Sequence, residues 1–138
     1  MYRASSDGAS AIVVSAFNGW VFGLRADNGQ RLWEVDIATG GMVRLAIEGQ
    51  VVVALGSTLC AIELHTGRVL WQVEVTREVA SGTLLVGDRA IFVADLGEMA
   101  AFDLQTGRQL WYERFAGKGT GAVAIALPGA SAQGDRSS

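Results

Sequence analysis

The stretch "HTGRVLW", residues 65–71, decides the fold, because close copies of it occur twice more in the 138-residue chain. The copies are "DNGQRLW" at 27–33 and "QTGRQLW" at 105–111. A glycine precedes a tryptophan by four residues each time, and the glycines are 38 and 40 residues apart. Spacing kept in this way indicates an internal repeat. The three pairs are Gly29 and Trp33, Gly67 and Trp71, and Gly107 and Trp111.

Each copy lies within a set of short apolar runs that are rich in β-branched residues and bounded by Gly, Asp, Ser or Asn. No run reaches ten residues without a turn signal, so strands are favoured over helices. Most runs are apolar at successive positions, which is typical of sheets covered on both faces. Antiparallel units of four strands, here named A to D, and of about 40 residues predict an all-β fold of β-propeller blades.

The glycine of each copy falls in the turn between strands C and D. A turn of this length places one residue in the left-handed conformation, which only glycine adopts cheaply. The repeated stretch is therefore expected to have a structural role and not to be a reactive site.

The third copy carries a family resemblance. Its extended form "AFDLQTGRQLW" (101–111) resembles the tryptophan-docking motif of pyrroloquinoline-quinone-type propeller repeats, A-x-D-x-x-T-G-x-x-x-W, at every defined position. The second copy differs only by Glu63, whereas the first departs at Gly23, Arg25 and Asn28. The resemblance covers roughly residues 11–127 and implies that each tryptophan packs between neighbouring blades, with the glycine as part of its dock.

The runs form three B–C–D sets, at 11–37, 51–75 and 90–115. A strands are expected within 42–49, 83–89 and 121–128, which makes three A strands for three B–C–D sets, permuted by one strand. The expected organisation is an N-terminal segment 1–10, propeller repeats over 11–130 (about 11–37, 42–75 and 83–115, with a closing strand at 121–128), and a disordered tail 131–138.

Three blades cannot close a ring at ordinary blade angles, since propellers have about four to eight blades. We expect residues 121–128 to complete the first blade of a second copy by strand exchange, which gives a six-bladed homodimer. A nine-bladed trimer, a foreign propeller fragment as partner, and a longer parent chain remain alternatives.

The resemblance also bears on cofactors. Enzymes of that family hold a quinone and a calcium ion with a carboxylate and an amide, use an aspartate base, and often stack adjacent cysteines on the cofactor. This chain has one cysteine, Cys60, and one histidine, His65. We expect Cys60 to be a buried, inert thiol and His65 to be a solvated turn residue. No catalytic residue, cofactor or metal is therefore predicted, and the chain is expected not to be an enzyme.

The surface offers the remaining candidates for a site. Strands alternate in direction, so the B–C and D–A loops should share one end of the propeller. Trp20 is out of pattern there, because its equivalents Thr58 and Glu98 are polar. It is expected either to stack on a ligand or partner or to cap the core. The candidate ligand or partner face comprises Trp20, Asn18, Arg77, Glu78, Asp95 and Glu98.

Composition narrows the function classes. Net charge is −3 with mixed signs, so no nucleic-acid partner is expected. No stretch of 18 apolar residues is present, and no membrane span is expected. The first residues do not resemble a secretion signal, so a cytoplasmic location is expected unless a signal has been trimmed. The predicted function is a non-catalytic scaffold or protein-binding platform. Its rivals are an oligomeric propeller lectin for small molecules or glycans, an enzyme subunit, and an adaptor that completes its ring with another chain.

Overall fold

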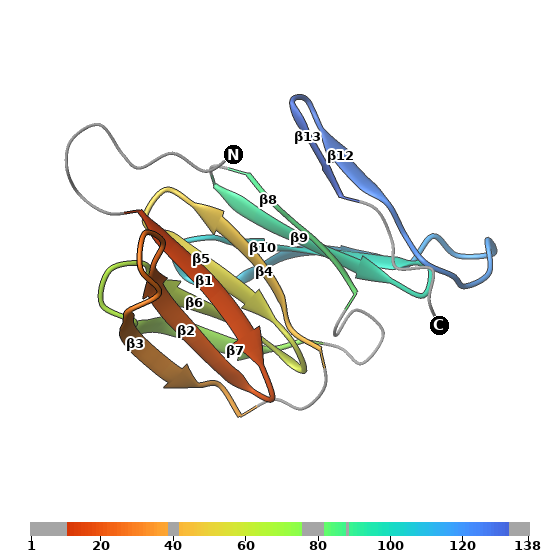
Figure 1. Ribbon diagram of the computed structural model, residues 1–138. Coiled ribbons are helices and arrows are strands. Elements are labelled where there is room, and N and C mark those ends of the chain that lie inside the picture. The colour runs from red at the N-terminus through yellow and green to blue at the C-terminus, as the bar shows by residue number, and fades with distance from the viewer. Residues whose placement is uncertain (1–10, 39–41, 76–81, 88, 133–138) are drawn as a thin grey trace.

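The computed structural model describes residues 11–38, 42–75, 82–87 and 89–132, which form antiparallel β-sheets only (Figure 1). The all-β fold class expected from the sequence is confirmed. The strands are β1 (Ile12–Phe17), β2 (Trp20–Arg25), β3 (Arg31–Asp36), β4 (Arg44–Glu48), β5 (Val51–Leu55), β6 (Thr58–Glu63), β7 (Val69–Glu74), β8 (Thr83–Val86), β9 (Ala90–Asp95), β10 (Glu98–Asp103), β11 (Gln109–Glu113), β12 (Ile125–Leu127) and β13 (Ala130–Ala132).

Each sheet is a meander whose neighbours in sequence are neighbours in space. The first blade holds β1–β2–β3, the second β4–β5–β6–β7 and the third β8–β9–β10–β11. The first described strands of successive sheets touch, β1 with β4, β4 with β8 and β8 with β12, so the blades follow one another around a common side (Figure 1). The first blade therefore has three described strands where the next two have four.

The C–D turns of the three blades share one backbone hydrogen-bond pattern. The N–H of Gly67 donates to the carbonyl of Glu63 at 2.9 Å, and the equivalent bonds at Gly29 and Gly107 are 2.8 Å. All three glycines have φ of 76° or 77°, the left-handed region that favours glycine. A register shift in the strand before each turn accompanies the pattern.

Different side chains support this one turn. The Asp103 carboxylate accepts the N–H groups of Gln105 and Thr106 at 2.8 and 3.1 Å. Glu63 accepts the corresponding pair, His65 and Thr66, at 2.8 and 2.9 Å, so its extra methylene leaves the turn intact.

The first turn departs from the motif and is supported differently. Asn28 accepts the N–H of Gln30 at 2.9 Å, as the Thr66 hydroxyl accepts that of Arg68 at 3.2 Å. Arg25 stands in place of the acid and pairs with Asp27 at 2.9 Å.

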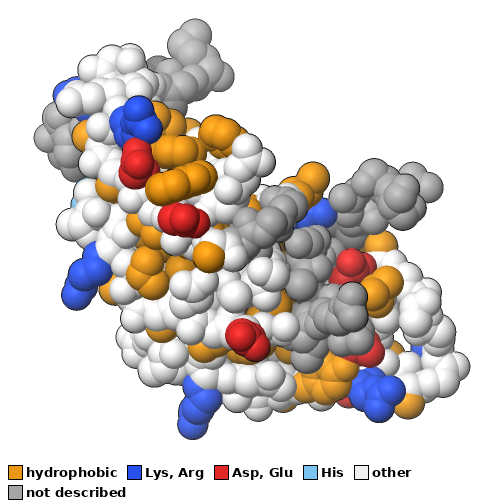
Figure 2. Space-filling model, turned by 90° about the horizontal axis from the view of Figure 1, so that it is seen from below, with side chains coloured by type: hydrophobic (Ala, Val, Ile, Leu, Met, Phe, Trp, Pro, Cys, Tyr) orange, Lys and Arg blue, Asp and Glu red, His pale blue; other side chains and the backbone are white. Residues whose placement is uncertain are grey.

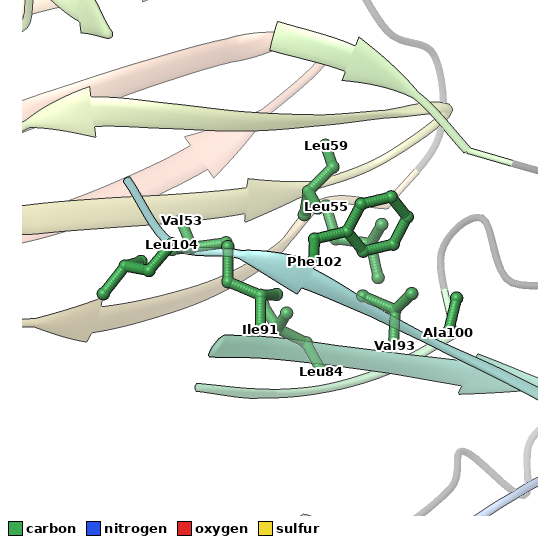
Figure 3. Packing of buried hydrophobic residues seen from close by; sticks show 9 residues of the cluster. All are labelled: Val53, Leu55, Leu59, Leu84, Ile91, Val93, Ala100, Phe102 and Leu104. Carbon is green, nitrogen blue, oxygen red and sulfur yellow. The ribbon is translucent and has the colours of Figure 1, made fainter. Parts of the chain in front are cut away.

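The second blade is buried on both faces, as its continuous apolar runs predict. Val53, Leu55 and Leu59 point toward the third blade, where they meet Ile91, Phe102 and their neighbours (Figure 3). The alternate residues Val52, Ala54, Cys60 and Ile62 pack against the first blade. Strand periodicity alone distributes these side chains between two interfaces.

The end of the chain differs from expectation. Within 121–128 only β12 is a strand, and it pairs with β13 of the same chain through three residue pairs. The turn Pro128–Gly129, with Gly129 at φ 87°, creates this hairpin, because proline followed by a left-handed glycine suits a tight reversal. Residues 131 and 132, expected to begin a disordered tail, therefore belong to β13, while 133–138 lie outside the described residues.

Candidate functional site

Trp33 joins the first blade to the second. It lies on β3, is 8% exposed, and its indole Nε1 donates to the carbonyl of Leu64 at 2.8 Å. The ring covers Gly67, where a Cβ would lie 2.7 Å from the indole Cδ2. Gly23, one of the departures from the motif, makes room on the near side, since a Cβ there would overlap the same indole. The buried N–H has a partner, so the ring is accommodated without an unsatisfied donor.

Trp71 makes the same contacts one blade further on. Its Nε1 donates to the carbonyl of Leu104 at 2.9 Å, and a Cβ at Gly107 would lie 2.5 Å from the indole Cε3. In both contacts the acceptor carbonyl is three residues before the glycine. The four-residue spacing of the sequence therefore does not mark one local site: Trp33 and Trp71 each meet the glycine of the following repeat.

The last tryptophan and the first glycine of the repeats have no such contact within the described residues. Trp111 on β11 is 45% exposed, with Phe92 as its aromatic neighbour at 6.1 Å between ring centroids. At the other end, Gly29 has no atom of the described residues within 4 Å of the place where a Cβ would be. It lines a hollow of about 470 Å³ together with Ser15, Phe17, Phe22, Leu24 and Arg31.

The face of the first blade around that hollow is apolar and exposed. Phe17 lies 5.5 Å from Phe22, and Trp20 is stacked 6.4 Å from Phe22, both measured between ring centroids. The Arg31 guanidinium lies 5.8 Å from the Phe22 ring and pairs with Glu34 at 2.8 Å. Figure 2 shows such hydrophobic side chains grouped beside charged ones on one face of the molecule. Apolar patches of this kind mark interaction surfaces.

The structure puts Trp20 in this aromatic group, on a sheet face next to a turn. Sequence reasoning singled out Trp20 but missed Phe17 and Phe22. The period-two alternation on either side of the Asn-Gly turn could have revealed them. The registers Phe17–Trp20 and Ser15–Phe22 place alternate residues of β1 and β2 on one face of the sheet.

The other residues of the candidate face have local partners and lie in two blades. Asn18, at φ 54°, is the first residue of the β1–β2 hairpin turn. Asp95 accepts the N–H of Leu96 at 2.9 Å, and Glu98 accepts the Tyr112 hydroxyl proton. The second blade separates Asn18 from Asp95 and Glu98, so the structure does not gather these residues. Arg77 and Glu78 lie outside the described residues.

The B–C turns and D–A connections meet at one end of the blades, as expected from strand direction. The N–H of Ile37 donates to the carbonyl of Gly19 at 2.8 Å, and that of Gly97 to the carbonyl of Gly121 at 2.9 Å. Gln72 of the second blade donates to the carbonyl of Ile37 at 3.2 Å. We name this end the loop end; backbone hydrogen bonds join its turns within the first and third blades, and the Gln72 side chain joins the second blade to the first.

Two residues of chemical interest sit in ordinary settings. Burial raises the pKa of the Cys60 thiol from its usual 9.0 to about 11. His65 lies in an exposed turn, 3.5 Å from Glu63. Partial desolvation raises the pKa of Glu63, but hydrogen bonds from Thr66 and His65 outweigh it and hold that pKa below its ordinary value. Within the part of the chain that the structure describes, no three acids, histidines or cysteines gather as metal ligands would, and no helix could span a membrane.

Repeated antiparallel blades of three or four described strands, joined by a tryptophan on the glycine of the next turn, define a propeller fold of the pyrroloquinoline-quinone repeat type. The model of the family described as outer membrane protein assembly factor BamB matches residues 17–136. The chain belongs to this family.

Curated relatives agree with the family match. The outer membrane protein assembly factor BamB of Burkholderia pseudomallei is 25% identical over 130 residues, which cover 80% of this chain and 34% of the relative. That of Nitrosomonas eutropha is 28% identical over 118 residues, covering 72% and 29%. The chain thus spans about a third of the length of the curated relatives it matches.

Solved structures share the fold. BamB from Moraxella catarrhalis aligns with a TM-score of 0.59 at 24% identity, over 80% of this chain and 36% of that one. The computationally designed protein Ika8 aligns with 0.65 at 20% identity, over 91% and 40%. A europium-containing methanol dehydrogenase aligns with 0.52 at 20% identity, over 76% and 23%. An enzyme and an assembly factor on one fold show that the fold leaves the activity open.

Proposed function

We propose that the chain is a non-catalytic propeller scaffold that binds protein partners during the assembly of outer membrane proteins. The observation that carries this proposal is the family match over residues 17–136, whose curated members are named as outer membrane protein assembly factors. The same names support a site of action at the cell envelope in place of the cytoplasm expected from the first residues.

The loop end is the part of the described chain best suited to partner binding. Rigid blades hold its turns, and the hydrogen bonds between Ile37 and Gly19 and between Gly97 and Gly121 fix connections that would otherwise be independent. Loops held on a rigid sheet scaffold are where propellers and similar folds place binding residues. The opposite end carries the C–D turns, whose side chains are engaged in supporting the turns themselves.

A photo-cross-linking amino acid at each end tests this proposal. Lys118 is exposed at the loop end, and Gln105 is exposed in a C–D turn at the opposite end, so they form a matched pair. With a detergent-solubilised outer membrane fraction of Burkholderia, Lys118 should give a cross-link to a defined assembly protein and Gln105 should not. Cross-links of equal yield from both positions, or from neither, would contradict a loop-end binding role.

A further inference from the structure

The two ends of the blade array are unlike and complementary. One end presents Trp111, the same residue of the repeat that fills the glycine docks inside the chain, but 45% exposed where Trp33 is 8% exposed. The other end presents Gly29, with the same left-handed φ as Gly67 and Gly107 but with an open hollow in place of an indole. Among the described residues, a tryptophan without a dock and a dock without a tryptophan therefore lie on opposite faces of the blade array.

The internal contacts define what would happen if these ends met. At both internal contacts the indole N–H donates to the carbonyl three residues before the glycine, at 2.8 and 2.9 Å. At the open dock that position is Ala26, whose N–H is already bonded to the carbonyl of Ala11 at 2.9 Å, as that of Leu64 is to Gln50. The backbone of the open dock is thus already arranged as in the filled ones.

The sheets themselves show a second complementarity. In the described residues the first blade lacks the leading strand that β4 and β8 provide in the other blades. At the far end the hairpin of β12 and β13 stands beside β8, where the leading strand of a following blade would lie, and β12 is paired only with the short β13. A first blade placed next to the third would bring its β1 alongside β12, the place that β13 now holds.

We propose that a second copy of this chain occupies the end face, with Trp111 of one copy in the Gly29 hollow of the other. β12 pairs with β1 of the second copy in exchange for β13. Two such contacts close a ring of six blades. The aromatic group of Phe17, Trp20 and Phe22 becomes buried between blades, as Val52 and Val53 are within the chain. This pairing is independent of partner binding at the loop end, and either can fail without the other.

The mass in solution tests the tryptophan contact. Light scattering should give twice 14.5 kDa for the full chain. Trp111→Ala, a change at an exposed position, should give a folded monomer by circular dichroism. Tyr112→Ala is the matched control, because it removes the adjacent exposed aromatic from the opposite face of β11, and it should remain dimeric. A monomeric full chain, or a Trp111→Ala variant that stays dimeric, would overturn the proposal.

Mixing variants tests whether unlike surfaces meet. Gly29→Ala fills the dock with a methyl group and should be monomeric, while Gly49→Ala bears the same left-handed strain at an open turn and should remain dimeric. A mixture of Trp111→Ala and Gly29→Ala restores one intact contact per pair, so dimers should reappear. Absence of dimers in the mixture would show that like surfaces pair, or that a foreign blade is the natural occupant, and would overturn the proposal.

Two truncations test the strand exchange. A chain ending at Gly129 keeps β12 but loses the competing β13, and should dimerise more tightly than the full chain. A chain ending at Gly121 loses β12 as well and should be monomeric. Equal dimerisation by both chains would remove β12 from the contact and overturn the exchange.

Discussion

At the scale of single residues, one turn geometry is built from several side chains. Asp103, Glu63 and Arg25 stand at the same repeat position, yet all three turns keep the glycine N–H bonded to the carbonyl of that residue. The glycine itself is not replaceable in this way. It combines a left-handed φ with the close approach of an indole, and a side chain opposes both.

Substituting the docked glycine should separate these two effects. Gly67→Ala adds left-handed strain and displaces the Trp33 ring, whereas Gly49→Ala adds only the strain. We expect a loss of about 1 kcal/mol for Gly49→Ala and a further ~1–3 kcal/mol for Gly67→Ala from overpacking. Urea unfolding of both variants measures the difference. Equal losses of unfolding free energy in the two variants would mean that the Trp33 ring moves aside without an energetic cost.

In the first and third blades, the hairpin turn between the B and C strands places its first residue in the left-handed conformation. Leu96 has φ 53° and is exposed, a conformation that leucine tolerates poorly, while Asn18 fills the same turn position in the first blade at φ 54°. Leu96→Asn should therefore raise the free energy of unfolding by about 1 kcal/mol, and Asn18→Leu should lower it by a similar amount. Opposite signs in thermal melts support the assignment; equal signs contradict it.

Cys60 gives a pH dependence. Its pKa is about 11 in the folded chain against a usual 9.0, so the unfolded chain releases the thiol proton first as pH rises. The free energy of unfolding should fall between about pH 9 and pH 11, on the order of 1 kcal/mol per pH unit. Cys60→Ala should remove this slope from urea unfolding curves measured across the window. A slope that survives the substitution would have to come from another group.

At the scale of elements, burial is uneven. β5 and β6 are covered by a blade on each side, whereas β1 alternates between half-buried and exposed residues and β11 is exposed throughout. Stability within a protein follows such differences, because well-packed strands open only with the whole domain.

Hydrogen exchange should reproduce this gradient. Backbone amides of β5 and β6 are expected to exchange most slowly, and those of β12 and β13 fastest among the strands, because that hairpin rests on three residue pairs. Exchange measured by NMR below the dimerisation concentration checks this expectation. Uniform protection across all strands would show that the described blades open only as one unit.

The sequence predicted the elements that carry many apolar residues. The four-strand repeat and the tryptophan–glycine spacing could be derived from it, because each rests on a pattern of several residues. β13 could not, since Ala130, Ser131 and Ala132 carry neither β-branching nor length. The partner of each tryptophan was equally hidden, because a contact such as Trp33 with Leu64 depends on how blades stack and not on spacing within one blade.

At the scale of the whole molecule, the open faces should make stability depend on concentration. Since folding of the end blades is linked to pairing in our proposal, the melting temperature should rise with protein concentration. Trp111→Ala should remove that rise and Tyr112→Ala should preserve it. Differential scanning calorimetry over a hundredfold range of concentration is the measurement. A concentration-independent melting temperature for the full chain would argue against linked pairing.

The direction of the tryptophan docks has a wider consequence. Every dock points the same way along the chain, from one blade to the next, so growth by this contact has polarity but no built-in end. Whether copies meet in a closed circle or continue as a fibre is then decided by the small rotation between blades. Packing residues such as Val53 and Phe102, which lie between the second and third blades and help to set that rotation, would act as regulators of assembly length although they are buried away from both open faces.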